Sequence, residues 1–501
     1  MLNETIEKLL VYANAHLGLD EEDITYTRNV ILELCHADRP FLGEMNISEL
    51  RGLKVPDQLI LELRTKLISE NIKSEAEVDN FIIRLMGILT PKPSEVSAKF
   101  RQLYKANRSK ATDYLYDLQV KNNYIQKTAV EQNIHWVSKF DKNNIEITIN
   151  LSKPEKDNKD IAKLKEIPVG EKYPACLLCK ENVGYAGNSN HPARGNLRII
   201  PLKLDQEQWF LQYSPYVYYD RHCIVFESVH EPMTISRRTV GKLLAFVDQF
   251  PHFFIGSNSD LPIVGGSILD HEHFQGGQYE FPLMKAKDLY TVRSRNPLVK
   301  VSVLDWYNST FHLVSVNKGA LLDAAMKIVE GWKGYENKEL DIIPKTGEVM
   351  HSTVTPIVRK VGRYYHMYII LRNNRTNEQY PDGIFHAHPK HHAIKKEGIG
   401  LIEAMGRFIL PARLKRQLHI IQALYDNKLD RAKLLEEQTD LAIFTDLYET
   451  LDRLPDGTNY DHAITEYVNI TCREILEATG VFKTDEMGKA AFKQFAESLK
   501  L

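Results

Sequence analysis

The sequence has few cysteines and almost no net charge. Its 501 residues include 5 cysteines, which are too few and too scattered for a disulfide framework. Lys and Arg together number 64 and Asp and Glu 66, so the formal net charge is only −2. Nothing in this balance indicates bulk binding to nucleic acid or to an anionic membrane, and we expect neither as a partner.

Long hydrophobic runs are absent as well. No run approaches the roughly 20 apolar residues that a membrane-spanning helix needs. The first residues, MLNETIEKLLVYANAHLG, lack the basic start and apolar core of a signal peptide, and their apolar residues follow helical spacing instead. We therefore expect a cytoplasmic protein. In that reducing compartment a Cys-x-x-Cys pair favours a metal or redox role over a structural bridge.

Length and composition predict two or three globular domains. A chain of 501 residues exceeds the usual size of one domain, and its contents of 43% hydrophobic and 26% charged residues are ordinary for a globular protein. Roughly residues 1–140 carry helical patterns, such as the apolar stripe of AEVDNFIIRLMGIL. We expect Ser94 to be the N-cap of the next helix. The charged residues 152–174 then make a reasonable boundary.

Strand and helix patterns alternate in the middle of the chain, and a similar order recurs later. IEITINL and RHCIVFESV are typical of strands, SRRTVGKLLAFVDQF of an amphipathic helix, and HFFIG and GSILDHEHFQ of strands again. The strand FHLVSV, the helix GALLDAAMKIVEGW and a hairpin TPIVRKVGRYYHMYIILRN that turns at Gly362 follow. Beyond residue 395 the chain is mostly helical. We predict an α+β fold divided into residues 1–140, 141–300 and 301–501.

The stretch GGSILDHEHFQGGQ, residues 265–278, could carry chemistry. If it is a strand, His271, His273 and Gln275 share one face because side chains alternate along a strand. The glycine pairs at 265–266 and 276–277 would let backbone and ligand approach closely, as phosphate sites often require. A metal site, a phosphate site, and ordinary strand and turn residues are the competing interpretations.

The pair in CLLC, Cys176 and Cys179, has the spacing with which two thiolates bind one zinc ion. A tetrahedral site needs four ligands, and no second Cys-x-x-Cys is present, so histidines or carboxylates elsewhere in the chain must supply the rest. Buried thiols or a redox pair would look the same, but nothing around the pair resembles a thioredoxin active site. We therefore rank zinc above redox chemistry.

A second group of histidines lies in FHAHPKHH, as His386, His388, His391 and His392. A solvated loop is as good an interpretation as a second metal or a phosphate contact. The following Lys395 and Lys396 could meet an anionic substrate or face solvent.

Together, the His-x-His-x-Gln unit, the Cys-x-x-Cys pair and the interposed ESVHEP resemble the hexose-1-phosphate uridylyltransferases of the histidine-triad superfamily. The likeness is closest to their class II branch, through CLLCKENVGYAG, QYSPYVYYDRHCIVF, FFIGSNSDLPIVGGSILDHEHFQGG and EGIGLIEAMGRFILPARL, within about residues 170 to 415. The resemblance implies two histidine-triad-like α/β halves with a helical N-terminal region and a helical C-terminal extension. It also implies a homodimer.

The resemblance implies a ping-pong reaction of the Leloir galactose pathway. His273 would attack the α-phosphorus of UDP-glucose and expel glucose 1-phosphate, and galactose 1-phosphate would then take the uridylyl group to give UDP-galactose. A neutral imidazole is a good nucleophile near pH 7, which suits this role. Gln275 would hold the phosphoryl oxygens. Because a neutral amide cannot act as a general acid, Gln275 favours transfer over hydrolysis.

The same resemblance assigns the remaining ligands and contacts. His230 and His271 would join Cys176 and Cys179 as ligands of a structural zinc ion. The resemblance also implies substrate contacts at Asn258, Ser267 and Glu403. Gly266, from the glycine pair, is a further proposed contact, and on charge grounds Arg194 and Arg198 could meet the diphosphate. Where the class I enzymes have proline between the two histidines, this chain has Glu272, which should point away from the nucleophile. The class I second metal site needs a glutamate that we cannot match, so no metal is assigned to His386, His388 or His391.

Two rival functions remain open at this point. One is a nucleotide hydrolase that uses the same His273, and Gln275 argues against it. The other is a zinc-stabilised nucleotide-binding protein without catalysis. The hexose specificity cannot be inferred from these patterns.

Overall fold

The computed structural model describes residues 1–152, 173–188, 191–455 and 457–501, which divide into two compact units. Unit 1 comprises Met1–Gln132 and Lys156–Glu231, and unit 2 comprises Asn133–Glu155 and Pro232–Leu501. Most of the expected boundary, residues 152–174, lies outside the described residues. The division into residues 1–140, 141–300 and 301–501 stays a prediction.

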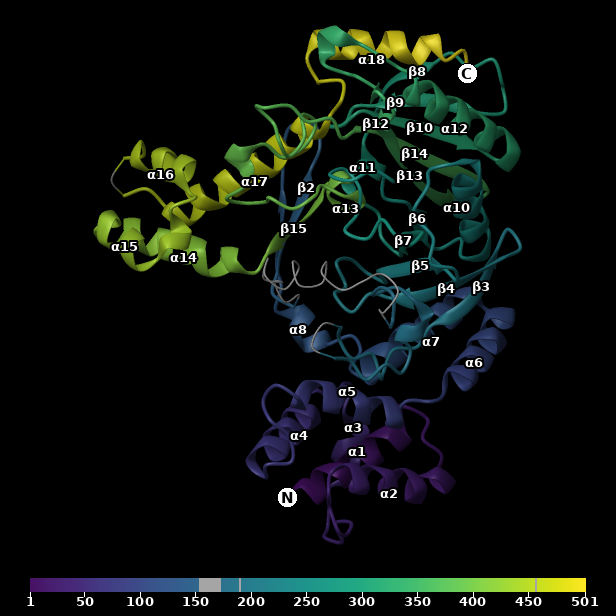
Figure 1. The fold of residues 1–501 in the computed structure, drawn as a ribbon, viewed down its shortest axis with the longest axis vertical. Helices are drawn as coiled ribbons and strands as arrows, with labels where there is room; N and C mark the ends of the chain where they lie inside the picture. Colours follow the sequence, from purple (N-terminus) through teal and green to yellow (C-terminus); the bar gives the residue numbers. More distant parts are fainter. Residues whose placement is uncertain (153–172, 189–190, 456) are drawn as a thin grey trace. The chain divides into compact units, whose positions relative to one another are not determined.

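The N-terminal part of unit 1 is helical, as predicted (Figure 1). Its helices are α1 (Leu2–His16), α2 (Ile24–Leu34), α3 (Ile47–Gly52), α4 (Asp57–Ser69), α5 (Val78–Leu89), α6 (Pro93–Ala106), α7 (Arg108–Lys121) and α8 (Lys127–Glu131). The apolar stripe of α1 is buried, with Ile6, Leu9 and Leu10 at most 1% exposed. Such burial of one face is what stabilises a short amphipathic helix.

Helix α6 begins earlier than the sequence suggested. Its N-cap is Lys92, and Pro93 occupies the first helical position, where its fixed φ and missing N–H suit the first turn. The backbone N–H of Lys92 donates to the Glu95 carboxylate at 2.8 Å. Ser94 therefore lies inside the first turn, and the expectation that it is the N-cap was wrong.

Unit 1 also contains an antiparallel sheet in the order β3 (Ile200–Leu204), β4 (Glu207–Tyr213) and β5 (Cys223–Glu227). Strands β3 and β4 form a hairpin through Asp205 and Gln206, whose φ angles of 49° and 70° are positive. Positive φ at both turn residues matches the twist of a two-residue hairpin. Strand β5 confirms the strand expected in RHCIVFESV.

Unit 2 is built on an antiparallel sheet covered on one face by two helices (Figure 1). Along the sheet the strands are β7 (His273–Gly277), β6 (Phe254–Gly256), β13 (Ser352–Val361), β14 (Tyr364–Asn373), β10 (Thr310–Ser315), β9 (Lys300–Leu304) and β8 (Asp288–Val292). The covering helices are α10 (Arg237–Gln249) and α12 (Lys318–Lys333). The predicted hairpin is β13–β14, and Gly362 has the positive φ of 57° that its turn requires.

A second sheet of unit 2 joins distant segments of the chain in the order β1 (Ile134–Ser138), β2 (Ile145–Asn150) and β15 (Arg407–Pro411). Strand β15 is parallel to β2, and Phe408 lies opposite Ile147. All residues of β2 are buried, including Glu146, whose carboxylate lies 2.6 Å from the Arg407 guanidinium. The strand at 407–411 interrupts a region that the sequence predicted as mostly helical.

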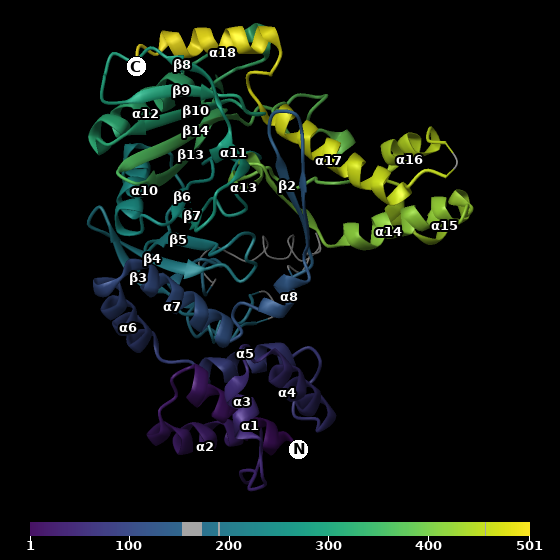
Figure 2. The ribbon, with the colours of Figure 1, turned by 180° about the vertical axis from the view of Figure 1, so that it is seen from behind.

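The remaining elements of unit 2 are mainly helices, and α14 to α17 gather on one side of it (Figure 2). They are α11 (Pro282–Lys285), α13 (Leu401–Ala404), α14 (Arg413–Asp426), α15 (Arg431–Glu437), α16 (Thr445–Asp452), α17 (Tyr460–Thr479) and α18 (Glu486–Ser498), with a small hairpin of β11 (Lys345–Thr346) and β12 (Val349–Met350). No helix within the described ranges has the length and apolarity needed to cross a bilayer. The predicted α+β fold is confirmed.

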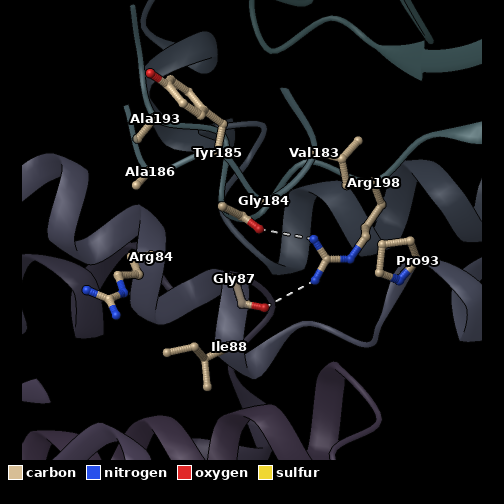
Figure 3. A pocket seen from close by; sticks show the side chains of 11 residues that line it. Arg84, Gly87, Ile88, Pro93, Val183, Gly184, Tyr185, Ala186, Ala193 and Arg198 are labelled. Carbon is tan, nitrogen blue, oxygen red and sulfur yellow. Dashed lines mark hydrogen bonds between the residues drawn. The ribbon is translucent and has the colours of Figure 1, made fainter. Parts of the chain in front are cut away.

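Arg198 ties the end of α5 to the loop that follows the Cys-x-x-Cys pair. It is 4% exposed, and burial lowers its pKa to about 10. Figure 3 shows its guanidinium aimed at the Gly87 carbonyl, beside a cavity of about 380 Å³. The guanidinium donates to the carbonyl oxygens of Gly87, Thr90, Pro91, Gly195 and Leu197. The carbonyls of Thr90 and Leu197 are fully buried at these contacts, so the guanidinium supplies a donor where water cannot.

We expect Arg198→Met to lower the free energy of unfolding by about 3 kcal/mol or more, because several buried carbonyls lose their donor together. Urea unfolding followed by circular dichroism measures this. Arg194→Met is the matched control: Arg194 is half-buried, and its Nη1 donates to the Ala193 carbonyl at 3.3 Å. The control should cost less than about 1 kcal/mol. Equal losses in the two variants would contradict this account of Arg198.

Candidate active site

His273 stands at the start of β7, with its imidazole held by the backbone. The ring Nδ1 lies 2.8 Å from the carbonyl oxygen of His271. A carbonyl can only accept, so Nδ1 carries the proton and the lone pair is on Nε2. Burial lowers the pKa of His273 to about 4, and the side chain is 6% exposed. The ring is therefore neutral at pH 7, with Nε2 in the form that can attack an electrophile.

The strand that carries this motif is shorter than predicted. It begins only at His273, so strand alternation places His273 and Gln275 on one face but does not extend to His271. The chain bends at His271, whose carbonyl oxygen is also the acceptor for the ring of His273. His271 itself is 1% exposed, and Gln275 is half-buried.

Glu272, between the two histidines, points to α10. The side chain is 3% exposed, and Arg238 Nη1 donates to its carboxylate at 2.9 Å. Thr239 Oγ1 lies 3.4 Å and Lys242 Nζ 3.9 Å from the same carboxylate. A buried carboxylate is stable only when cations and donors surround it in this way. The first turns of α10 therefore anchor the peptide that carries the two histidines.

Asn258 follows strand β6 and joins two loops. Strands β6 and β7 pair Gly256 with Gln275, so the same register continued past the end of β6 puts Asn258 opposite His273. The Asn258 Oδ1 accepts a hydrogen bond from the Leu401 N–H at 2.9 Å. A Cβ added at Gly266 would lie only 2.7 Å from Asn258 Nδ2, so a side chain there would displace the amide. Asn258 and Gly266, two predicted substrate contacts, are thus brought together.

Glu403 belongs to the neighbouring helix α13 and is 8% exposed. Its carboxylate lies 3.0 Å from Lys395 Nζ, which also donates to the Ile409 carbonyl at 2.9 Å. Lys395 is 4% exposed, so it does not face solvent, whereas Lys396 does. The helix begins at Leu401, whose N–H is bound by Asn258. Glu403 is therefore connected to the same cluster as Asn258 and Gly266.

Two other predicted contacts have different surroundings. Ser267 is exposed, in the loop after Gly266. Arg194 belongs to unit 1, where its guanidinium stacks on the Tyr124 ring at 5.9 Å from the ring centroid. Their roles toward a substrate stay predictions.

The histidine-rich segment is not a solvated loop, because two of its histidines are buried. His386 and His391 are 3% and 2% exposed. His388 Nε2 lies 3.0 Å from the Ile384 carbonyl, and His391 Nδ1 accepts the His388 N–H at 3.1 Å. Within the described ranges, this segment contributes to no group of three or more side chains whose ligand atoms could share an ion, although His391 Nε2 lies 3.3 Å from a carboxylate oxygen of Glu474. These side chains instead fold the segment onto its own backbone.

Unit 1 contains a compact group of metal-binding side chains. Cys176 Sγ lies 3.6 Å from Cys179 Sγ, and Cys179 Sγ lies 3.2 Å from His230 Nδ1. Two sulfurs that share a tetrahedral zinc ion lie about 3.8 Å apart, and a sulfur and a nitrogen about 3.6 Å apart. The Cys/His group therefore fits a metal ion of this kind. It could bind a metal, as the sequence predicted.

The local backbone supports this group. Asn182 donates from Nδ2 to the carbonyls of Cys176 and Cys179, both at 2.8 Å, and the Leu178 N–H points at Cys176 Sγ from 3.3 Å. Hydrogen bonding to Cys179 and burial raise the pKa of the Cys176 thiol well above its ordinary range. A metal ion must therefore displace a proton from this thiol to bind it.

Comparison with known proteins identifies the class and then the family. The profile described as galactose-1-phosphate uridyl transferase, N-terminal domain, matches residues 20–232, and the corresponding C-terminal profile matches residues 246–437. Both profiles describe an enzyme of the nucleotidyltransferase class. This chain is 41% identical over 505 residues to the galactose-1-phosphate uridylyltransferase of Clostridium acetobutylicum and 42% identical over 510 residues to that of Bacillus subtilis. These alignments cover 100% of this chain and 100% of the first relative, and 99% of this chain and 97% of the second.

The chain belongs to the galactose-1-phosphate uridylyltransferase family. Among solved structures, yeast Ap4A phosphorylase is 12% identical, with a TM-score of 0.29 over 62% of this chain and 86% of that one. A DUF4931 family protein from Bacillus cereus has a TM-score of 0.26 and 12% identity over 35% of this chain and 85% of that one. Both TM-scores are too low to establish a shared fold.

Sequence reasoning missed Arg372 and gave no role to His386. Both contact the backbone just before α13: Arg372 Nη2 donates to the Ile399 carbonyl at 2.6 Å, and the Ile399 N–H donates to His386 Nε2 at 3.1 Å. A signal was present for Arg372, since an arginine at the end of the apolar run MYIIL must be buried with a partner or end the strand.

We expect Glu272→Ala to lower the free energy of unfolding by roughly 3–5 kcal/mol, because Lys242 loses a buried counter-charge. Glu280→Ala is the matched control: Glu280 also pairs with an arginine, Arg359, but its side chain is 50% exposed. The control should cost less than about 1 kcal/mol, since exposed ion pairs contribute little. Thermal or urea unfolding compares the two variants. Similar losses would show that Glu272 is no anchor.

Proposed function

We propose that this enzyme transfers a uridylyl group from UDP-glucose to galactose 1-phosphate through a covalent intermediate on His273. The proposal is carried by the hydrogen bond from His273 Nδ1 to the His271 carbonyl, because it leaves the Nε2 lone pair for the substrate. The names of the relatives supply the reaction class and one substrate, galactose 1-phosphate.

In the first displacement, His273 Nε2 forms a bond to the α-phosphorus, and the bond from that phosphorus to the bridging oxygen breaks. Glucose 1-phosphate leaves with the bonding electrons. In the second, a phosphate oxygen of galactose 1-phosphate attacks the same phosphorus, and the N–P bond breaks to regenerate neutral His273. No proton has to move in either step. The uridylylated ring carries a positive charge, which the His271 carbonyl stabilises through Nδ1–H.

Gln275 would bind the phosphoryl oxygens through its side-chain amide. It lies two residues after His273 on the same strand and therefore on the same face. Its amide can donate hydrogen bonds to the charge that develops on the phosphoryl group, but it cannot protonate a leaving group at pH 7. We therefore favour transfer over hydrolysis.

The remaining predicted residues would form the substrate contacts. We assign the nucleotide to Asn258, the phosphates to Gly266, Ser267 and Arg194, and a hexose hydroxyl to Glu403. Asn258 is supported because the β6–β7 register, continued past the end of β6, places it opposite His273. The close approach of Gly266 to Asn258 supports assigning both residues to the site. The hydrogen bond from the Leu401 N–H to Asn258 connects α13, which carries Glu403, to this cluster and supports assigning Glu403 to a hexose contact.

We further propose that the metal is zinc and that its ligands are Cys176, Cys179, His230 and His271. The spacing of the three donor atoms in unit 1 supports the site, and two thiols with imidazole nitrogens are the donor set that zinc prefers. Zinc bound by four protein ligands supplies structural stability and has no open position for substrate. A reducing cytoplasm, which keeps the thiols available, is the proposed compartment, and a homodimer is the proposed assembly.

UDP-glucose labelled in the uridine tests the nucleophile. Without an acceptor, wild type should form about one equivalent of an acid-labile, base-stable adduct and release glucose 1-phosphate, and His273→Ala should form none. His312→Ala is the matched control, because His312 is also a strand histidine whose pKa burial lowers to about 4. It should keep the adduct.

Other outcomes of this experiment identify the rival functions. Continuous release of UMP without acceptor would indicate a hydrolase, and binding without an adduct would indicate a binding protein. Label retained by His273→Ala would rule out the assigned nucleophile.

Metal analysis of purified protein tests the zinc site. Cys176→Ser should lose about one equivalent of zinc relative to wild type, because a hydroxyl is a poor ligand. Cys35→Ser is the control, since Cys35 is a buried thiol of unit 1 outside the ligand group. Unchanged zinc in Cys176→Ser, or equal loss in both variants, would refute the assignment.

A further inference from the structure

The backbone at Ile399 is held from both sides by two buried side chains. On one side the Ile399 N–H donates to His386 Nε2 at 3.1 Å, and on the other Arg372 Nη2 donates to the Ile399 carbonyl at 2.6 Å. His386 comes from the histidine-rich segment and is 3% exposed, and Arg372 comes from β14 and is 1% exposed. We call these two side chains the Ile399 clamp.

The chain on both sides of Ile399 also makes close contacts. Two residues on, the Leu401 N–H donates to Asn258 Oδ1 at 2.9 Å. A Cβ added at Gly400 would lie 3.1 Å from the same oxygen, and one added at Gly398 would lie 3.2 Å from the Ile263 carbonyl. Both glycines therefore allow a close approach of backbone that other residues would oppose.

The clamped segment leads directly into α13 and Glu403. Helix α13 is only 4 residues long, so its orientation depends on the backbone just before it. Glu403 lies four residues after Ile399, and its carboxylate faces Lys395 Nζ at 3.0 Å. A shift of Ile399 would therefore move the Glu403 carboxylate.

Stability alone does not account for the clamp. Within the described part of the chain, Arg372 Nε and Nη1 are buried without a hydrogen-bond partner, and burial lowers the pKa of Arg372 to about 10. Burying a charge with unmet donors costs free energy, and an apolar residue would avoid that cost. Burial also lowers the pKa of His386 to about 4, so its Nε2 stays able to accept the Ile399 N–H at neutral pH.

We propose that Arg372 and His386 are positioning residues that set hexose recognition by fixing the Ile399 backbone and, through it, Glu403. This inference rests on the proposed contact between Glu403 and a hexose hydroxyl. It gives the histidine-rich segment a role in substrate selection without a metal.

A matched pair of variants tests the His386 hydrogen bond. The oxygen of a glutamine can reach the place of Nε2, whereas that of an asparagine is too short to do so. We expect His386→Asn to raise the KM for galactose 1-phosphate roughly tenfold or more, with a smaller change in kcat, and His386→Gln to recover most of the loss. Arg372→Met and Arg372→Lys form a second pair. His391→Asn, in the same segment but without a bond to Ile399, should keep the wild-type KM.

Monodeoxy galactose 1-phosphates give a readout that a general loss of stability would not move. Wild type should discriminate against the analogue that lacks the hydroxyl bound by Glu403, and Glu403→Gln should lose this discrimination. His386→Asn and Arg372→Met should lose this discrimination for the same analogue. When either is combined with Glu403→Gln, the double variant should discriminate no less than Glu403→Gln alone, because both changes act on the same contact.

The outcomes distinguish a wrong role for Glu403 from a wrong role for the Ile399 clamp. If Glu403→Gln keeps the discrimination while wild type is active, the proposed role of Glu403 is wrong and the clamp inference falls with it. If Glu403→Gln loses it but His386→Asn and Arg372→Met keep it, the clamp inference alone is overturned. Equal losses in His386→Asn and His386→Gln would also overturn it, since the hydrogen bond would not be the cause. Absence of any uridylyl adduct in wild type would refute the proposed reaction itself.

Discussion

The chemistry proposed for this enzyme depends on one hydrogen bond, between His273 Nδ1 and the carbonyl oxygen of His271 at 2.8 Å. It selects the tautomer, orients the ring and leaves Nε2 for phosphorus. The acceptor of this hydrogen bond is a backbone carbonyl. The orientation of the His273 ring therefore depends on how firmly that peptide is held. Glu272 supplies that rigidity, because its carboxylate is held by the first turns of α10. The proposed nucleophile, His273, is thus positioned through its neighbour Glu272, which contacts α10.

The same principle recurs in other parts of both units. Three buried cations hold backbone: Arg198 binds carbonyls at the end of α5, Arg372 binds the carbonyl of Ile399, and Lys395 binds that of Ile409. Loops that carry function cannot satisfy their polar groups within a helix or sheet, so side chains from elsewhere must do it. Such side chains are expensive to bury and costly to remove.

Elements with strong periodicity could be predicted from the sequence. The amphipathic α10 and α12 and the hairpin β13–β14 all form where the patterns indicated. The start of β7 and the existence of β15 could not. Strand β15 exists only because β2, more than 250 residues earlier, pairs with it, as Ile147 with Phe408. Local patterns carry no information about such a partner, and tertiary pairing overrides them.

The sequence by itself determined which residue types could do chemistry: the spacing of the histidines, the thiol pair and the glycines needs no coordinates to be recognised, because it is local along the chain. Only the tertiary structure decided what the histidine-rich segment does. Its four histidines suggested a metal or a solvated loop, yet His386 binds the backbone of Ile399, 13 residues away. Hydrogen-bond partners of buried polar groups are chosen by the packing of distant elements, and that packing is a property of the whole fold.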